Sequence, residues 1–144
     1  MRLTQFTDFG LRACMRMAGE PERAFSTSEL AKEFAISRNH LTKTVAALAH
    51  AGIVVTRRGT GGGATLARPA DQISVGQVVE VLERGSALVE CFQPDGGACV
   101  VAPECRLKGM LFRARRRFIA ELEQFTLADC ALPQQASVAD DHDA

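Results

Sequence analysis

The sequence contains no apolar run that approaches the ~20 residues required by a membrane-spanning helix. Its first six residues, MRLTQF, also lack the apolar core of a secretion signal. The cysteine count is 5, an odd number, and without such a signal a disulfide framework is not expected. Neither a nucleophile–base set nor a cofactor fingerprint is present. We therefore predict a soluble, cytoplasmic protein that is not an enzyme.

Net charge is also absent, because 17 basic residues balance 17 acidic ones. The two halves nevertheless differ. Residues 1–69 hold ten Lys and Arg against five Asp and Glu, whereas residues 70–144 hold seven against twelve. A basic half beside an acidic half suggests that the first half approaches a polyanion, although ordinary solvated faces give similar balances. Charge alone leaves both interpretations open.

The first half carries the sequence signals of three helices. Apolar residues at helical spacing predict a helix over residues 4–18. Ser26 and Glu29 form a capping box at the start of a short second helix. A tight connection then leads to a third helix over residues 38–50, which Ser37 caps.

A β-hairpin is predicted after the third helix. Residues 53–56 are rich in β-branched side chains and residues 64–67 form the returning strand, with a basic, glycine-rich turn between them. Two helices joined by a short turn and followed by a hairpin with a basic tip are in the order of a winged helix-turn-helix.

Polar residues at the start of the third helix and in the hairpin are the predicted DNA contacts. In a helix-turn-helix the second helix of the motif, here the helix predicted over residues 38–50, enters the major groove with its N-terminal residues nearest the base edges. Arg and Asn can bridge the edges of guanine and adenine, and glycine lets the wing backbone approach a groove. The predicted contacts to double-stranded operator DNA are Ser37, Arg38, Asn39, His40, Thr42, Lys43, Arg57, Arg58, Gly61 and Gly62. A solvated polar face is the alternative, and His40 alone is weak support.

The second half begins with a helix that Ser74 caps, and a long helix follows from Pro103 to about Phe125. Its expected apolar face consists of Leu107, Met110, Leu111, Ala114, Phe118, Leu122 and Phe125. A helix this long in a small chain must cover its apolar face, so we predict that part of it packs on a second copy. A two-fold homodimer would also place two recognition helices along the DNA.

These elements predict a fold that is mainly α with a small β-hairpin wing, a winged helix-turn-helix plus a long C-terminal dimerisation helix. The expected DNA-binding domain covers residues 1–69. The dimerisation helix and the loop before it, which carries three cysteines, occupy residues 70–130. Residues 131–144 are polar and acidic, and we expect them to be a disordered tail.

Three cysteines lie within fifteen residues, in a C-x7-C-x5-C pattern ahead of the long helix: Cys91, Cys99 and Cys105. Clustered thiolates favour soft metals. Usual zinc sites have four ligands at tighter spacing, so three thiolates without a local His better match an iron–sulfur cluster with one iron left for an oxygen or nitrogen ligand. Pro103 is expected in the first helical turn, where the helix dipole would favour a Cys105 thiolate. Structural cysteines without metal are the alternative. Cys14 is expected to be a small buried hydrophobe, and Cys130 to stay free.

Several motifs together resemble the NsrR branch of the winged-helix regulators that also include IscR. They are LTQFTDFGLR at residues 3–12, SRNH at 37–40, RGTGG at 58–62 and LARP at 66–69, then CRL at 105–107 and FTLAD at 125–129. The likeness covers about residues 1–130. It implies a homodimeric transcriptional repressor whose iron–sulfur cluster is attacked by nitric oxide, which releases the operator DNA.

The resemblance also implies the ligands of that cluster. Cys91, Cys99 and Cys105 would bind it, and the fourth ligand would come from the partner's first helix, where Asp8 matches. Asp8 has a rival role as a cap or ion-pair partner, and Glu90 and Glu104 compete by proximity. A 4Fe-4S cluster is favoured, while a 2Fe-2S cluster fits the same ligands. A cluster-supply or thiol-redox-sensing regulator of the same fold is the alternative function.

Overall fold

The structure is a computed structural model that describes residues 2–133, and residues 134–144 of the expected tail lie outside them. Its helices and strands are α1 (Gln5–Gly19), α2 (Thr27–Glu33), α3 (Arg38–His50), β1 (Val54–Arg57), β2 (Gly63–Leu66), α4 (Val75–Leu82) and α5 (Arg106–Leu122). Three short 3-10 turns are η1 (Ala70–Gln72), η2 (Glu90–Phe92) and η3 (Ala102–Glu104). Among the described helices, none is long and apolar enough to cross a membrane.

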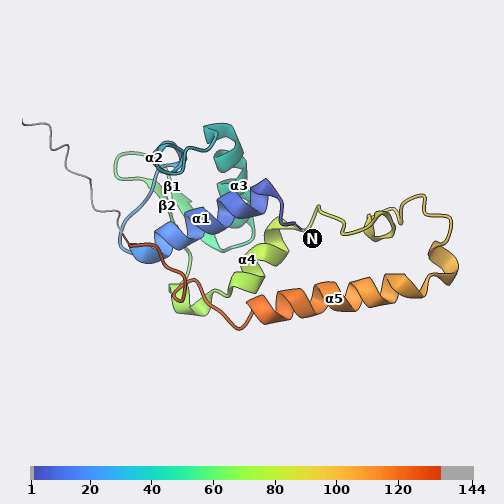
Figure 1. Ribbon diagram of the computed structural model, residues 1–144. Helices are drawn as coiled ribbons and strands as arrows, with labels where there is room; N and C mark the ends of the chain where they lie inside the picture. Colours follow the sequence, from blue (N-terminus) through green and yellow to red (C-terminus); the bar gives the residue numbers. More distant parts are fainter. Residues whose placement is uncertain (1, 134–144) are drawn as a thin grey trace, which may run out of the picture.

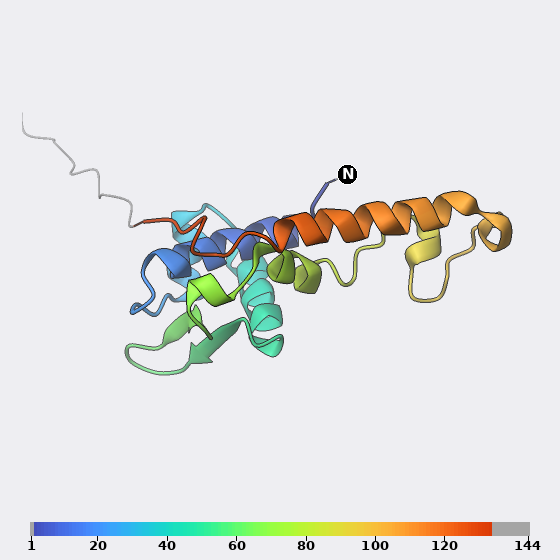
Figure 2. The ribbon, with the colours of Figure 1, turned by 90° about the horizontal axis from the view of Figure 1, so that it is seen from below.

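The chain forms a body and a projecting arm (Figure 1; Figure 2). The body contains α1 to α4 and the hairpin. The arm consists of α5 and the loop of residues 85–104, which runs along the helix in both views. After α5 the chain returns to the body, where Leu127 is fully buried and the N–H of Leu132 donates to the carbonyl of Met15 at 2.9 Å. The end of the described chain is thereby fixed against α1.

The core of the body lies where α1, α3 and α4 pack together. Gly10 of α1 is at this crossing, because a Cβ atom there would lie 2.3 Å from Cδ1 of Leu82 and 3.0 Å from Cγ2 of Thr44. The missing side chain therefore lets α1 approach both other helices. Leu41 and Leu48 of α3 are fully buried. Because the two helices are in close contact, a shift of α1 must also displace α3.

Local capping explains where several helices begin. The hydroxyl of Ser26 accepts a hydrogen bond from Glu29 N–H at 3.1 Å, and that of Ser74 accepts from Gln77 N–H at 3.0 Å. Both predicted caps are confirmed. Ser37 occupies the cap position of α3, but its side chain makes no capping hydrogen bond. The bounds of α3 are those predicted.

The hairpin pairs Val54 with Leu66 and Arg57 with Gly63, so each strand is displaced by one residue from the prediction. Ile53 lies just before β1 and is fully buried in the core. Phe25 and Ala64 exchange two backbone hydrogen bonds of 3.0 and 2.8 Å, which tie the hairpin to the segment before α2. The two-stranded wing is thereby joined to the body.

The predicted start of the long helix at Pro103 is wrong. Pro103 belongs to η3, and α5 begins only at Arg106, because Cys105 has an extended backbone and is the residue that precedes the helix. No helix follows Thr126 in the described chain. Asp129 instead accepts hydrogen bonds from the N–H and the hydroxyl of Thr126 at 2.7 and 3.1 Å, which close a turn.

Candidate DNA interface and cysteine loop

One face of α3 is packed in the core and the other is open. Leu41, Thr44, Val45 and Leu48 are buried. The six residues predicted to contact DNA from this helix and its cap are all exposed: Ser37, Arg38, Asn39, His40, Thr42 and Lys43. The structure therefore brings these six side chains onto the solvent face of one helix.

His40 connects this face to α1. Its ring stacks on the ring of Phe9, with centroids 6.3 Å apart and an interplanar angle of 25°. Phe9 packs against the hydrophobic core and directly follows Asp8 in the sequence. The first turn of α3 is thus in contact with the same helical turn that carries Asp8.

The wing presents Arg57, Arg58 and Gly61 to solvent, while Gly62 is half-buried. All five ion pairs found within residues 2–133 use Arg12, Arg16 or Arg23. Arg38 and Lys43 of α3 and the two wing arginines consequently have no acidic partner there. Exposed cations that the described residues leave without an acidic partner are suited to DNA phosphates.

The three clustered cysteines lie in the loop and at the start of α5. All five cysteines are free thiols, and Cys91, Cys99 and Cys105 are half-buried. The loop is attached to the helix at η2, where the rings of Phe92 and Phe112 meet edge to face with centroids 6.4 Å apart. Phe112 was absent from the predicted apolar face because it faces the loop rather than the side occupied by Leu107.

Glu90 and Gly97 stabilise the turn by which the cysteine loop reverses direction. Gly97 has φ of +62°, and a Cβ atom there would lie 2.5 Å from the carbonyl oxygen of Glu90. Oε1 of Glu90 accepts from the N–H of Ala98 at 3.1 Å, and Oδ1 of Asp95 accepts from Gly97 N–H at 2.9 Å. The Glu90 carboxylate thus supports the turn between the first two cysteines of the cluster.

The donor set matches an iron–sulfur cluster in chemistry but is not gathered into a site by this chain alone. Within residues 2–133, no group of three or more His, Cys, Asp or Glu side chains is close enough to hold a metal ion. The thiol of Cys105 makes no capping hydrogen bond at the N-terminus of α5, so both the thiol and the helix N–H groups remain available. Three free thiols on a loop with glycine hinges fit three-thiolate ligation of a cluster.

Asp8 lies apart from the cysteine loop of its own chain. The start of α1 is at the root of the arm, whereas the loop extends along α5 (Figure 1). The Asp8 carboxylate is partly exposed and pairs with Arg12 at 2.7 Å. With Leu3 and Leu11 it also lines an open hollow at the start of α1. The ion pair is the rival role expected for Asp8, while Glu104 is exposed beside Cys105.

The other two cysteines are removed from the loop. Cys14 is fully buried, as expected, and burial together with the nearby Cys130 raises the pKa of its thiol to about 12. Burial and the neighbouring Asp129 also raise the pKa of Cys130. Its thiol donates weakly to the carbonyl of Thr126 at 3.7 Å. Neither thiol has the exposed, ionised character of a reactive cysteine.

Glu83, at the C-cap position of α4, is a structural residue that the sequence does not predict. Its Oε1 atom accepts hydrogen bonds from the N–H and hydroxyl of Thr4 at 2.8 and 2.9 Å, and from the hydroxyl of Thr7. Burial raises the pKa of Glu83, but the hydrogen bonds from Thr7 and Thr4 outweigh burial and hold the pKa below its ordinary value. No local sequence signal indicates a contact between residues so far apart.

Comparisons with known proteins agree with this arrangement. The sequence model of the Rrf2 family, described as an iron-dependent transcriptional regulator, matches residues 3–132. The HTH-type transcriptional regulator NsrR of Shouchella clausii is 38% identical over 133 residues, which are 92% of this chain and 89% of that protein.

Solved structures give the same picture. The structure of IscR from T. potens has 26% sequence identity and a TM-score of 0.69, and the match covers 90% of this chain and 85% of that one. Oxidised CymR of Staphylococcus aureus has 26% identity and a TM-score of 0.67, with 94% and 100% of the two chains covered.

Proposed function

Because the chain belongs to the Rrf2 family of transcriptional regulators, we propose that it is a homodimeric repressor that holds an iron–sulfur cluster and leaves operator DNA when nitric oxide attacks that cluster. The observation that carries this proposal is the set of three free thiols, Cys91, Cys99 and Cys105, on an arm attached to a helix-turn-helix with unpaired basic residues. The similarity to NsrR of Shouchella clausii supports the repressor class.

Exposed apolar side chains support the homodimer. Among residues 2–133, seven large apolar residues are exposed, and six of them lie between residues 100 and 125: Val100, Val101, Leu107, Met110, Phe112 and Phe125. α5 has no buried residue at all within one chain. Apolar side chains exposed in this number on one arm are typical of a surface that a partner covers. In the proposal, residues 70–130 form the cluster-binding and dimerisation region, and residues 1–69 form the DNA-binding domain.

Four residues would hold the cluster. Cys91, Cys99 and Cys105 of one chain would each bind an iron through sulfur, and the partner's Asp8 would supply the carboxylate. A 4Fe-4S cluster is favoured because it leaves one iron for a non-thiolate ligand, and a 2Fe-2S cluster is the variant. When bound, the cluster supplies an iron that nitric oxide attacks, and carboxylate ligation keeps that iron more exchangeable than a fourth thiolate would.

In the proposal, contacts between α1 and α3 connect Asp8 to the predicted recognition helix. Asp8 and Phe9 are adjacent on α1, and Phe9 stacks on His40 at the start of the recognition helix. Gly10 lets α1 touch Thr44, one turn further along α3. A displacement of α1 when Asp8 loses its partner would therefore move the predicted base-reading residues. Fixed half-site spacing makes the affinity of a dimer sensitive to such a movement.

The experiment is anaerobic reconstitution followed by operator binding with and without nitric oxide. The loaded protein should be coloured and should bind operator DNA, and nitric oxide should abolish both the visible absorption and the DNA complex. Asp8→Asn should accelerate cluster loss, whereas Arg116→Gln on the exposed side of α5 should not. The proposal would be refuted if the protein stays colourless after anaerobic reconstitution and its affinity for the operator is the same before and after that treatment.

A second function keeps the same fold but senses cluster supply or thiol oxidation. The similarity to IscR and to oxidised CymR, together with five free thiols, favours it as the alternative. It predicts that peroxide or iron depletion changes operator binding while nitric oxide has no effect. Titration of one preparation with all three treatments separates the two functions.

A further inference from the structure

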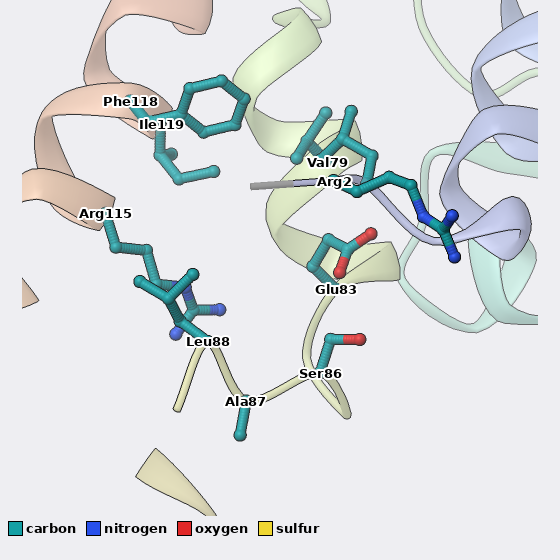
Figure 3. A pocket seen from close by; sticks show the side chains of 10 residues that line it. Arg2, Val79, Glu83, Ser86, Ala87, Leu88, Arg115, Phe118 and Ile119 are labelled. Carbon is teal, nitrogen blue, oxygen red and sulfur yellow. The ribbon is translucent and has the colours of Figure 1, made fainter. Parts of the chain in front are cut away.

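A pocket of about 240 Å³ lies at the joint between the arm and the body. It is formed by α4, α5, the start of the cysteine loop and the segment that precedes α1 (Figure 3). Neither the DNA interface nor the proposed cluster ligands contribute to it. Its size suits a small metabolite rather than a drug-sized ligand.

One wall of the pocket is apolar. Figure 3 shows Phe118 and Ile119 of α5 facing Val79 of α4 across the space. Leu3 and Leu88 close the same region from the N-terminal segment and the loop. This wall would receive a branched or unbranched aliphatic group, whose burial is favourable by about 25 cal/mol per Å².

The opposite part of the pocket holds charges of both signs. Arg115 of α5 reaches toward Leu88, and no acidic residue of chain segment 2–133 forms an ion pair with it. The carboxylate of Glu83 lies on the wall beside Ser86. The guanidinium groups of Arg2 and Arg115 and the carboxylate of Glu83 line the pocket next to its apolar wall, so the pocket offers charges of both signs to a zwitterion with an aliphatic side chain.

We propose that this pocket binds a free aliphatic α-amino acid of about the size of leucine. Its carboxylate is recognised by the guanidinium of Arg115, which presents a planar set of donors suited to that group. Its ammonium group pairs with Glu83, and its side chain packs against Phe118 and Val79. The bound molecule would contact both α4 and α5, and so would add a second small-molecule input at the base of the arm, beyond the proposed cluster.

The test uses the full chain, which contains no Trp, so a single introduced indole reports without background. Leu88→Trp places that indole on the pocket wall. We expect L-leucine to change its fluorescence with a Kd of about 1 mM or tighter. The unmodified chain should show a rise in Tm over the same concentrations. Agreement of the two measurements excludes an effect of the reporter.

Ligand analogues and a matched pair of variants identify the contacts. Isopentylamine lacks the carboxylate and 4-methylpentanoate lacks the ammonium group, so each should bind at least about tenfold more weakly than leucine. Arg115→Gln should weaken leucine binding by a similar factor. Arg113→Gln, an exposed position on the same helix, should leave it unchanged.

Three results would overturn the assignment. Leucine and both analogues could bind equally, which would mean a nonspecific apolar hollow. Arg115→Gln could have no more effect than Arg113→Gln, which would remove the carboxylate contact. Finally, both the fluorescence and the Tm could fail to respond to leucine, while the fluorescence changes with protein concentration. That result would mean that a second copy of the chain fills the pocket.

Discussion

Oε1 of Glu83 accepts a hydrogen bond from the backbone N–H of Thr4 at 2.8 Å. This contact joins the C-terminal cap of α4, just ahead of the cysteine loop, to the residue that caps α1. The hydroxyls of Thr4 and Thr7 donate to the same oxygen. The loop that carries the clustered cysteines therefore starts from a residue that holds the beginning of α1 in place.

Glu83→Ala should lower the free energy of unfolding by about 1–3 kcal/mol, because it removes the acceptor of the half-buried donors of Thr4 and of the buried hydroxyl of Thr7. Glu80→Ala on the exposed side of the same helix is the control, and a change within about 0.5 kcal/mol is expected there. Urea unfolding measures both variants. Equal effects of the two substitutions would show that the hydrogen bonds of Glu83 do not stabilise the fold.

The Glu83 carboxylate also makes the free energy of unfolding depend on pH, and the direction of the change can be predicted. The pKa of Glu83 is lower in the folded chain than its ordinary value of 4.5. Its contribution to stability is therefore fully present above pH 4.5 and is lost as the pH falls through the lower folded value. Unfolding measured between neutral and acidic pH should show this loss in the unmodified chain. The part of the loss that is due to Glu83 should be missing in Glu83→Gln.

Gly76 and Gly109 provide a matched test of the joint between α4 and α5. A Cβ atom at Gly76 would lie 2.7 Å from the backbone nitrogen of Glu123 and 2.8 Å from the carbonyl oxygen of Ile119. At Gly109 the nearest atom would be a side-chain nitrogen at 3.8 Å. Both glycines lie in helices, so alanine gains about 0.5–1 kcal/mol of helix propensity at either position.

Gly109→Ala should therefore raise the free energy of unfolding, whereas Gly76→Ala should lower it by about 1–3 kcal/mol because the backbones must separate. Denaturant midpoints measured side by side decide the sign of each change. If Gly76→Ala is as stable as Gly109→Ala, the close contact between α4 and the end of α5 does not exist in solution.

Features set by neighbouring residues could be predicted from the sequence, and features set by distant contacts could not. The bounds of α3 follow from two local signals, because Ser37 occupies the cap position, although without a side-chain capping bond, and the apolar spacing of the helix is regular. The start of α5 was misplaced because the extended backbone of Cys105 depends on how the loop packs against the helix. The partners of Glu83 lie 76 and 79 residues away in sequence, where periodicity carries no information.

The candidate sites divide in the same way. The exposure of the candidate DNA-binding residues of α3 could be predicted, because an amphipathic helix fixes which of its sides faces solvent. The clustered cysteines could be identified by spacing, but the spacing does not fix their geometry, and the described residues do not gather them into a site. The amino-acid pocket escaped prediction because its charged residues, Glu83 and Arg115, come from different helices.

Lys43→Ala and Arg57→Ala test the DNA face. Each should weaken binding by a similar factor for specific and random DNA, because each removes a phosphate contact rather than a base contact. The slope of log K against log salt should become shallower by about one unit per lost contact. Arg116→Ala on α5 is the control of equal charge. An unchanged slope in both variants would remove α3 and the wing from the interface.

Differential reactivity of the five thiols tests the cysteine loop. Cys14 is fully buried and its pKa is raised to about 12, so iodoacetamide should not modify it at neutral pH until the chain unfolds. Cys91, Cys99 and Cys105 are accessible in the cluster-free protein and should be modified first. Anaerobic cluster loading should protect these three together, while Cys130 keeps its slow rate. Mass spectrometry of peptides, with denatured protein as the reference for complete labelling, gives the rate at each site. If loading protects Cys14 or Cys130 instead, or only one cysteine of the loop, the three-thiolate assignment is wrong.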